Sequence, residues 1–218
     1  MNQTDIYRIK KVDKPILLNL KKDKTKKKDK IIWSEFSIFV FIKKSKNLKN
    51  RSILILLKKL IFSLPSYERE YCGKIVLYFQ KRLNNLYNSI SSKLVEMEID
   101  LKDTFGFFGK IAGELRYYSK DINSLHPIFS EWDQSDSFLF VNLQRKNIFI
   151  AREILKQDAF LYNESALFNL CKISNYIIRK SGDEDEFEII TRNPNVIQSI
   201  NSIWDKLKKN DFNINETF

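Results

Sequence analysis

Apolar residues recur at every third or fourth position through the middle of the chain, the pattern of a helix with one buried face. The longest series runs from Ile75 to Leu101 and predicts a helix of about 30 residues. Its apolar positions are Ile75, Phe79, Leu83, Leu86, Ile90, Leu94, Met97 and Leu101. Shorter series of the same kind predict helices over residues 107–119, 138–157 and 160–180.

The last part of the chain carries clear local signals. Asn193 is a good helix cap and Pro194 suits a first helical turn, so we expect a final helix with its apolar face at residues 196, 200, 203 and 207. The apolar residues of 187–191 predict a short strand before it. Two helices followed by a strand also loosely fit a winged-helix DNA reader.

The first third of the chain mixes strand and helix signals. Residues 31–42 are rich in β-branched and aromatic side chains and predict a strand that is buried on both faces or nearly so. Residues 52–64 begin with an apolar run that fits a strand, but the spacing of their leucines favours a helix. Between residues 21 and 30, seven lysines repel one another and have nothing to bury, which predicts a mobile arm.

These patterns together predict an α+β, mainly helical fold. A small N-terminal β-containing segment would be followed by a bundle of about five helices. We expect residues 1–64 to form a basic N-terminal region with one or two strands and the lysine-rich arm, and residues 65–218 to form a helical domain.

The charge of the chain is distributed very unevenly. Residues 1–60 carry 18 Lys and Arg against 5 Asp and Glu, whereas residues 61–218 carry 20 against 22, so the net charge of +11 comes from the first part. The chain has 29 Lys against 9 Arg and many Asn and Ile, as codons from an A/T-rich genome favour. Codon bias explains the amount of lysine, but it does not explain why the positive charge lies at one end.

A cluster of cations of this kind predicts contact with nucleic acid or another polyanion, because lysines that neutralise phosphates release bound counterions. The candidate nucleic-acid-binding residues are Lys21, Lys22, Lys24, Lys26, Lys27, Lys28, Lys30, Lys43, Lys44, Lys46, Lys49 and Arg51. Tyr7, Trp33 and Phe36 lie near them in sequence, and single-stranded bases stack on such side chains. Lysine makes point-charge contacts without reading bases. The alternative interpretation is a solvated lysine-rich face.

Signals of enzymes and metal proteins are weak. His126 is the only histidine, and it would need a nucleophile or a carboxylate beside it to act as a base. Glu96, Asp100 and Asp103 would share one face of the predicted long helix, as a magnesium site or as a solvated face. A helix crossing explains the spacing of Gly106, Gly109 and Gly113 better than a phosphate-binding loop does. We therefore expect no cofactor and no metal ion, and catalysis stays uncertain, with an enzyme disfavoured.

Location and partners follow from what the sequence contains. We expect an intracellular, cytoplasmic protein, because no export signal or transmembrane segment is visible. Cys72 and Cys171 are then expected to be free thiols in the core. The alternative function is a structural or adaptor subunit, whose apolar N-terminal strands pair with another protein.

Overall fold

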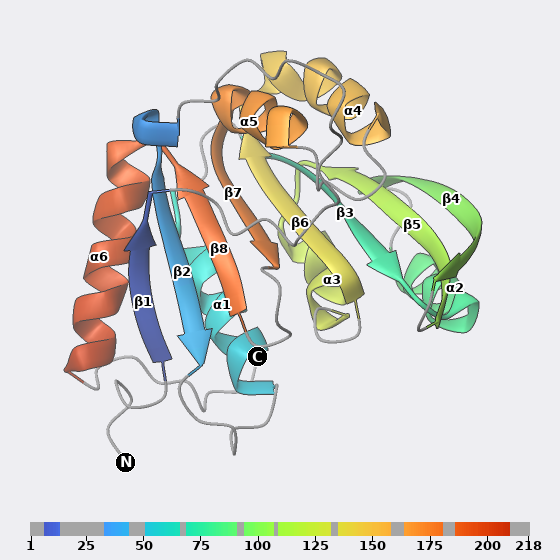
Figure 1. The fold of residues 1–218 in the computed structure, drawn as a ribbon, viewed down its shortest axis with the longest axis horizontal. Coiled ribbons are helices and arrows are strands. Elements are labelled where there is room, and N and C mark those ends of the chain that lie inside the picture. The colour runs from blue at the N-terminus through green and yellow to red at the C-terminus, as the bar shows by residue number, and fades with distance from the viewer. Residues whose placement is uncertain are drawn as a thin grey trace.

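One antiparallel sheet organises the molecule. The structure, a computed structural model, describes residues 7–13, 33–43, 51–65, 69–90, 94–106, 109–131, 135–157, 164–180 and 186–209. The described strands form an eight-stranded sheet with the order β1-β2-β8-β7-β6-β3-β5-β4, and every neighbouring pair is antiparallel (Figure 1). They are β1 (Tyr7–Val12), β2 (Ser37–Lys43), β3 (Glu70–Leu77), β4 (Val95–Gly106), β5 (Gly109–Ser119), β6 (Ser135–Leu143), β7 (Ser174–Lys180) and β8 (Glu186–Thr191).

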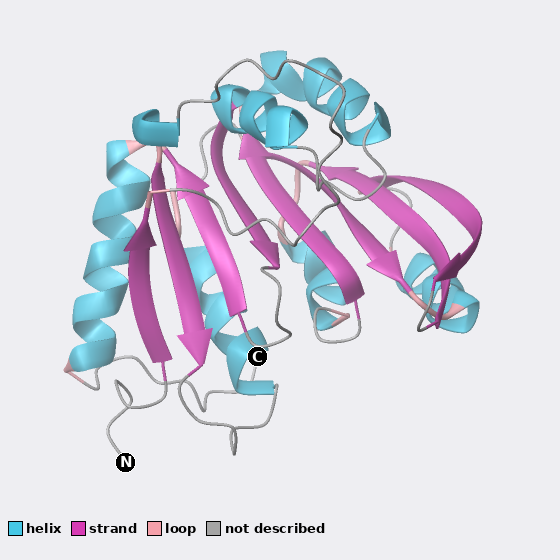
Figure 2. Cartoon of the chain, viewed as in Figure 1, coloured by secondary structure: helices cyan, strands magenta, loops and turns pink. Residues whose placement is uncertain are grey.

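Helices cover both faces of this sheet. The first face packs against α1 (Arg51–Ser63), α2 (Gln80–Ser89), α3 (His126–Ser130) and α6 (Pro194–Lys208). The second face packs against α4 (Ile148–Gln157), α5 (Glu164–Ile173) and the short 3₁₀ helix η2 (Trp33–Glu35). The 3₁₀ helices η3 (Asn123–Leu125) and η4 (Arg145–Asn147) lie in connections. Figure 2 shows the resulting three layers, with α4 and α5 at the upper end of the sheet.

The alternation of side chains along each strand divides the core into two parts. In β3, Tyr71 and Ile75 point into the core under α1, α2, α3 and α6, while Cys72 points into the core under α4 and α5. All eight residues of β3 are buried, because the strand lies in the interior of the sheet with helices on either side. A strand buried on both faces loses the alternation of apolar and polar residues.

The prediction of a mainly helical bundle is therefore wrong. The segment predicted as one helix from Ile75 to Leu101 consists of the end of β3, then α2, then the start of β4. The stripe through Leu83 and Leu86 is a true helical face, and both residues are buried. The apolar residues of β3 and β4 continue that stripe by coincidence of spacing, which produced the single long series.

The other predicted helices are corrected in the same way. Residues 107–119 were expected to be helical, but the described part forms β5, and the three glycines lie in β4 and β5 instead of at a helix crossing. Residues 138–157 divide into β6 and α4, and residues 160–180 contain α5 and β7. The winged-helix arrangement is wrong for this reason, since β6 and β7 are neighbours in the central sheet.

Several local predictions are confirmed. Residues 52–63 lie in α1, residues 187–191 lie in β8, and residues 37–42 of the strand predicted over 31–42 lie in β2. The cap of α6 is as expected, because the Asn193 side chain accepts a hydrogen bond of 3.0 Å from the backbone N–H of Asn195. The two cysteines are buried free thiols. Within the described residues, no helix is long and apolar enough to cross a membrane.

The basic N-terminal region shares the sheet with the rest of the chain. β2 pairs with β8, so strands from residues 1–64 and from residues 65–218 belong to the same sheet. The strand β2 lies between β1 and β8, and its apolar side chains are buried on the faces of the sheet, with Ile38, Val40 and Phe41 fully buried. Among the described N-terminal strands, β1 is the one with a free edge.

A close approach fixes the centre of the sheet. The Tyr117 hydroxyl reaches from β5 past Gly73 of β3 and donates a buried hydrogen bond of 2.7 Å to the backbone oxygen of Leu139 in β6. A Cβ atom at Gly73 would lie 2.0 Å from that oxygen and 2.4 Å from the hydroxyl. The hydrogen bond therefore requires glycine at this position.

Candidate functional site

A cavity of about 520 Å³ opens at the end of the sheet where β6 and β8 finish and β7 begins. Its described lining contains two cations, Lys172 and Arg192, and no carboxylate. The remaining polar side chains are one serine and five amides, namely Ser174, Gln144, Asn147, Asn175, Asn193 and Asn195. A polar cavity with this charge favours an anionic occupant.

Hydrogen bonds to backbone oxygens hold the lining in place. Arg192 follows β8, and its Nη2 donates a bond of 2.7 Å to the backbone oxygen of Lys172 in the last turn of α5. Asn147 of η4 donates a bond of 2.7 Å to the backbone oxygen of Ile173. These two bonds join three connections that are separate in sequence, so the tertiary fold places Lys172 and Arg192 in the lining of one cavity.

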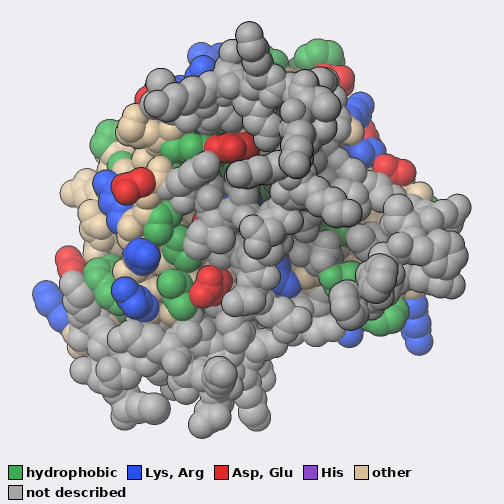
Figure 3. Space-filling view, in the orientation of Figure 1, with side chains coloured by type: hydrophobic (Ala, Val, Ile, Leu, Met, Phe, Trp, Pro, Cys, Tyr) green, Lys and Arg blue, Asp and Glu red, His purple; other side chains and the backbone are tan. Residues whose placement is uncertain are grey.

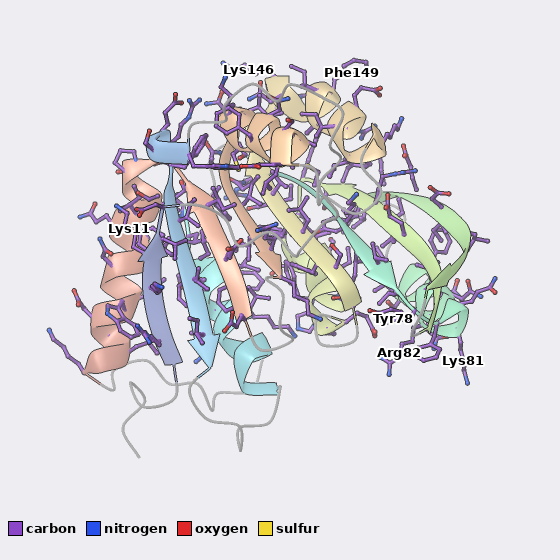
Figure 4. All side chains as sticks on the ribbon, in the orientation of Figure 1. Lys11, Tyr78, Lys81, Arg82, Lys146 and Phe149 are labelled. Atoms are coloured by element: carbon purple, nitrogen blue, oxygen red, sulfur yellow. The ribbon has the colours of Figure 1, made fainter. Side chains whose placement is uncertain are left out.

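The surroundings add positive potential. The N-terminus of α6 lies at the cavity, and the positive end of a helix dipole favours negative charge in its first turn. Arg145 and Lys146 of η4 are exposed at the same end. Figure 4 shows Lys146 extending from the upper end of the molecule, and Figure 3 shows basic side chains along that border with acidic ones among them. The arrangement suits the binding of phosphate groups.

A second cavity, of about 460 Å³, lies between α4 and the nearby ends of β4 and β5. Its charges balance, since the described lining holds three cations and three carboxylates, namely Lys120, Arg145, Arg152, Glu70, Glu96 and Asp121. Arg152 forms an ion pair with Glu96 and lies 4.2 Å from the centre of the Tyr118 ring. The Ser124 hydroxyl bonded to Asp121 lowers the pKa of that carboxyl. This cavity has less preference for an anion than the first.

Buried ion pairs lie on the α4/α5 face of the sheet. Lys74 and Glu114 are fully buried, with 3.6 Å between Nζ and Oε2. Arg179 and Glu188 are also buried, with 2.6 Å between Nη2 and Oε2. Removing one partner of such a pair is strongly destabilising, whereas the intact pair contributes little. Because these groups are closed to solvent, we assign them a structural role.

His126 does not have the surroundings of a catalytic base. Its Nε2 lies 3.0 Å from Nζ of Lys58, and the nearby carboxylate of Glu131 accepts from Arg82 instead. Burial lowers the pKa of His126, and the charge of Lys58 lowers it further, so neutral His126 accepts from Lys58. Burial also lowers the pKa of Lys58.

The magnesium alternative for Glu96, Asp100 and Asp103 is not assembled in the described part of the chain. Glu96 and Asp100 lie on β4 and not on a helix, and Glu96 is paired with Arg152. The described residues contain no group of three His, Cys, Asp or Glu side chains that could hold a metal ion.

The candidate nucleic-acid-binding residues fall mostly outside the described residues. Those outside are Lys21, Lys22, Lys24, Lys26, Lys27, Lys28, Lys30, Lys44, Lys46 and Lys49. The backbone of Lys43 ends β2, and that of Arg51 begins α1. Lys43 pairs with Tyr7 at the end of the sheet opposite the cavity, about 20 Å away along β2.

The flanks of the lysine-rich segment lie near the cavity. Val12 pairs with Ile38, and Ser37 pairs with Thr191, the residue before Arg192. The described residues on either side of 14–32, at the end of β1 and at the start of η2, therefore lie at the cavity end of the sheet.

Sequence reasoning missed Lys172 and Arg192. They are 20 positions apart, and each is an isolated basic residue in a region of nearly balanced charge. The one local signal was an arginine directly before a well-marked helix start at Asn193 and Pro194. That signal does not reveal the second cation or the cavity between them.

Comparison of the chain with known protein families, with curated proteins and with solved structures finds no match. The function of the chain is therefore inferred from its own geometry and charge.

Proposed function

We propose that this chain is a non-enzymatic binding protein that engages nucleic acid or another polyanion. The observation that carries the proposal is the cavity with Lys172, Arg192 and no described carboxylate, at the end of the sheet where the described ends of β1 and η2 lie. A phosphate in the cavity and neighbouring phosphates on Lys21–Lys30 would belong to one polyanion.

The chemistry predicts affinity without strong sequence preference. Lysines and a single arginine contact phosphates as charges, and such contacts position a nucleic acid without reading its bases. Each neutralised phosphate contributes about −0.9 to the slope of log K against log salt on duplex DNA and about −0.7 on a single strand. Binding should therefore be steeply dependent on salt and similar for unrelated sequences.

The test measures binding of fluorescent duplex and single-stranded DNA between low and moderate salt. The variant Lys172→Gln/Arg192→Gln should reduce the magnitude of the duplex slope by about 2, because two phosphate contacts are lost. The variant with Lys24, Lys26, Lys27 and Lys28 changed to Gln should reduce it further.

A matched control removes two charges elsewhere. Lys206 and Lys209 are exposed at the far end of α6, so Lys206→Gln/Lys209→Gln should leave the slope almost unchanged. Thermal unfolding by circular dichroism checks that each variant is folded. No binding at low salt, or equal losses in the cavity variant and in this control, would contradict the proposal.

A further inference from the structure

The two outer strands of the sheet carry opposite charge. Among the described residues, no strand pairs with the outer edge of β1 or with the outer edge of β4. β1 exposes three cations, Arg8, Lys10 and Lys11, and Lys11 extends toward the side where α6 lies (Figure 4). β4 alternates acidic and apolar residues from Val95 to Leu101. Free edges of this kind are templates for pairing with another chain.

Two of the three cations of β1 lie on the same face of the sheet as the acidic residues of β4, whereas Lys11 lies on the other face with Ile9. Val12 packs in the core under α4 and α5, so Arg8 and Lys10, at alternate positions, point to that face. On β4, Glu96 and Glu98 contact Arg152 and Lys156 of α4, so the acidic residues also point there. The opposite face of the two edges carries Ile9 on β1 and apolar residues on β4.

The direction of the strands permits a repeated sheet. Seven antiparallel steps separate β1 from β4, so the two strands run in opposite directions. A second copy placed beside the first, with its faces in the same orientation, therefore brings its β1 against β4 as an antiparallel neighbour. No strand has to reverse or change its face.

We propose that copies of this chain associate head to tail, with β1 of one copy extending the sheet of the next at β4. In one register Arg8 lies opposite Asp100 and Lys10 lies opposite Glu98 on the charged face. On the other face the same register places Ile9 opposite Ile99. Opposite charges and apolar side chains at facing positions stabilise antiparallel pairs.

Exposed apolar side chains on β4 support β1 of another copy as the strand that pairs there. Ile99 is 36% exposed and Leu101 is 58% exposed, although both lie on the face of β4 that the helices partly cover. Pairing with β1 of another copy would cover part of this surface. A partner strand of alternating basic and apolar residues fits β4, and residues 7–10 of β1 have this alternation, whereas Lys11 would face Met97 on the apolar side.

The charges also select the symmetry of the contact. Two β1 strands placed together would bring cations opposite cations, and two β4 strands would bring carboxylates opposite carboxylates. Like charges at facing positions are destabilising. The contact is therefore heterologous, and a heterologous contact that does not close into a ring continues as an open assembly.

The experiment is sedimentation of nuclease-treated protein over a range of concentrations up to about 500 µM, because a six-residue strand pair is smaller than a standard interface. The wild type should show a mass that rises with concentration and falls with salt. Arg8→Asp and Asp100→Arg, each alone, should weaken association about fivefold or more, because each places like charges opposite each other. Asp100 makes no ion pair among the described residues, so its reversal spares the fold.

Two combinations of these substitutions distinguish a lost strand contact from a loss of folding. The double variant Arg8→Asp/Asp100→Arg should associate again, and so should a mixture of the two single variants, because opposite charges face each other in both cases. Lys172→Gln, at the cavity beside the interior strand β7, should associate as the wild type does. A wild type that stays monomeric throughout, or a double variant and a mixture that both fail to associate, would overturn the proposal.

These outcomes are independent of the proposed binding of polyanions. The samples contain no nucleic acid, and neither Arg8 nor Asp100 lines the basic cavity. Loss of DNA binding in Lys172→Gln/Arg192→Gln would leave the association unchanged.

Discussion

Replacement of Gly73 by alanine should be among the most destabilising single changes in the sheet. The new Cβ would lie 2.0 Å from the backbone oxygen of Leu139 and 2.4 Å from the hydroxyl of Tyr117. The backbone oxygen has no rotamer to adopt, so β3 and β6 must move apart by more than about 1 Å to reach ordinary contact. That movement also strains the buried hydrogen bond between Tyr117 and Leu139.

The magnitude follows from two contributions. Overpacking a well-packed core costs about 1–3 kcal/mol, and a buried oxygen left without its hydrogen bond costs about 1–3 kcal/mol more. Alanine returns about 0.5–1 kcal/mol of backbone entropy relative to glycine in a strand. We therefore expect Gly73→Ala to lower the free energy of unfolding by about 1–5 kcal/mol, and the upper part of this range is a large fraction of the stability of an ordinary domain.

Urea unfolding followed by circular dichroism measures this loss, and two further variants locate its cause. Tyr117→Phe alone should cost about 1–2 kcal/mol, because it removes the hydrogen bond and keeps the ring. Gly73→Ala/Tyr117→Phe should remain much less stable than Tyr117→Phe, because the contact with the Leu139 oxygen persists. A cost below about 1 kcal/mol for Gly73→Ala, or full rescue by Tyr117→Phe, would refute the reasoning.

Three other predictions concern single positions, each tested by urea unfolding. Leu86→Ala should lower the free energy of unfolding by about 2–5 kcal/mol, because Leu86 is buried. Tyr87→Ala changes a side chain that is 43% exposed and should lower it clearly less. Equal losses would contradict the packing of α2. Arg69 has a φ of 50°, so Arg69→Gly should keep or raise stability by up to about 1 kcal/mol, while Arg69→Ala should give no gain. Burial and then the charge of Lys58 lower the pKa of His126, so the unfolded chain binds its proton more readily, near pH 6.5. The wild type should therefore lose stability as the pH falls from about 7 through the pKa of His126 in the folded chain. His126→Gln should lose less stability between about pH 7.5 and 5. Parallel losses in the two proteins would exclude a contribution from His126.

Local chemistry in the sequence was enough for elements with their own start and stop signals. Asn193 and Pro194 mark the start of α6 because capping and the fixed φ of proline act within one helical turn. α1 and β8 were also predicted, since each has a spacing or composition that suits one conformation. The burial of Leu86 followed from its apolar stripe even though the surrounding element was misjudged.

The central sheet was decided by tertiary structure. Helices on both faces bury every residue of β3, so its sequence lacks the alternation that marks a half-exposed strand. An apolar run of this kind fits a buried strand or a buried helix equally well, and only its partners β5 and β6 decide between them. For this reason strands next to true helices were predicted as parts of longer helices.

The candidate site shows the same division. The excess of positive charge in residues 1–60 can be counted from the sequence, because composition needs no fold. The basic cavity cannot be found from composition, because Lys172 and Arg192 line one cavity only where α5, β7 and β8 come together. The opposite charges of β1 and β4 can likewise be read from the sequence. Only the fold makes these two strands the edges of one sheet, with Arg8, Lys10 and the acidic residues of β4 on one face.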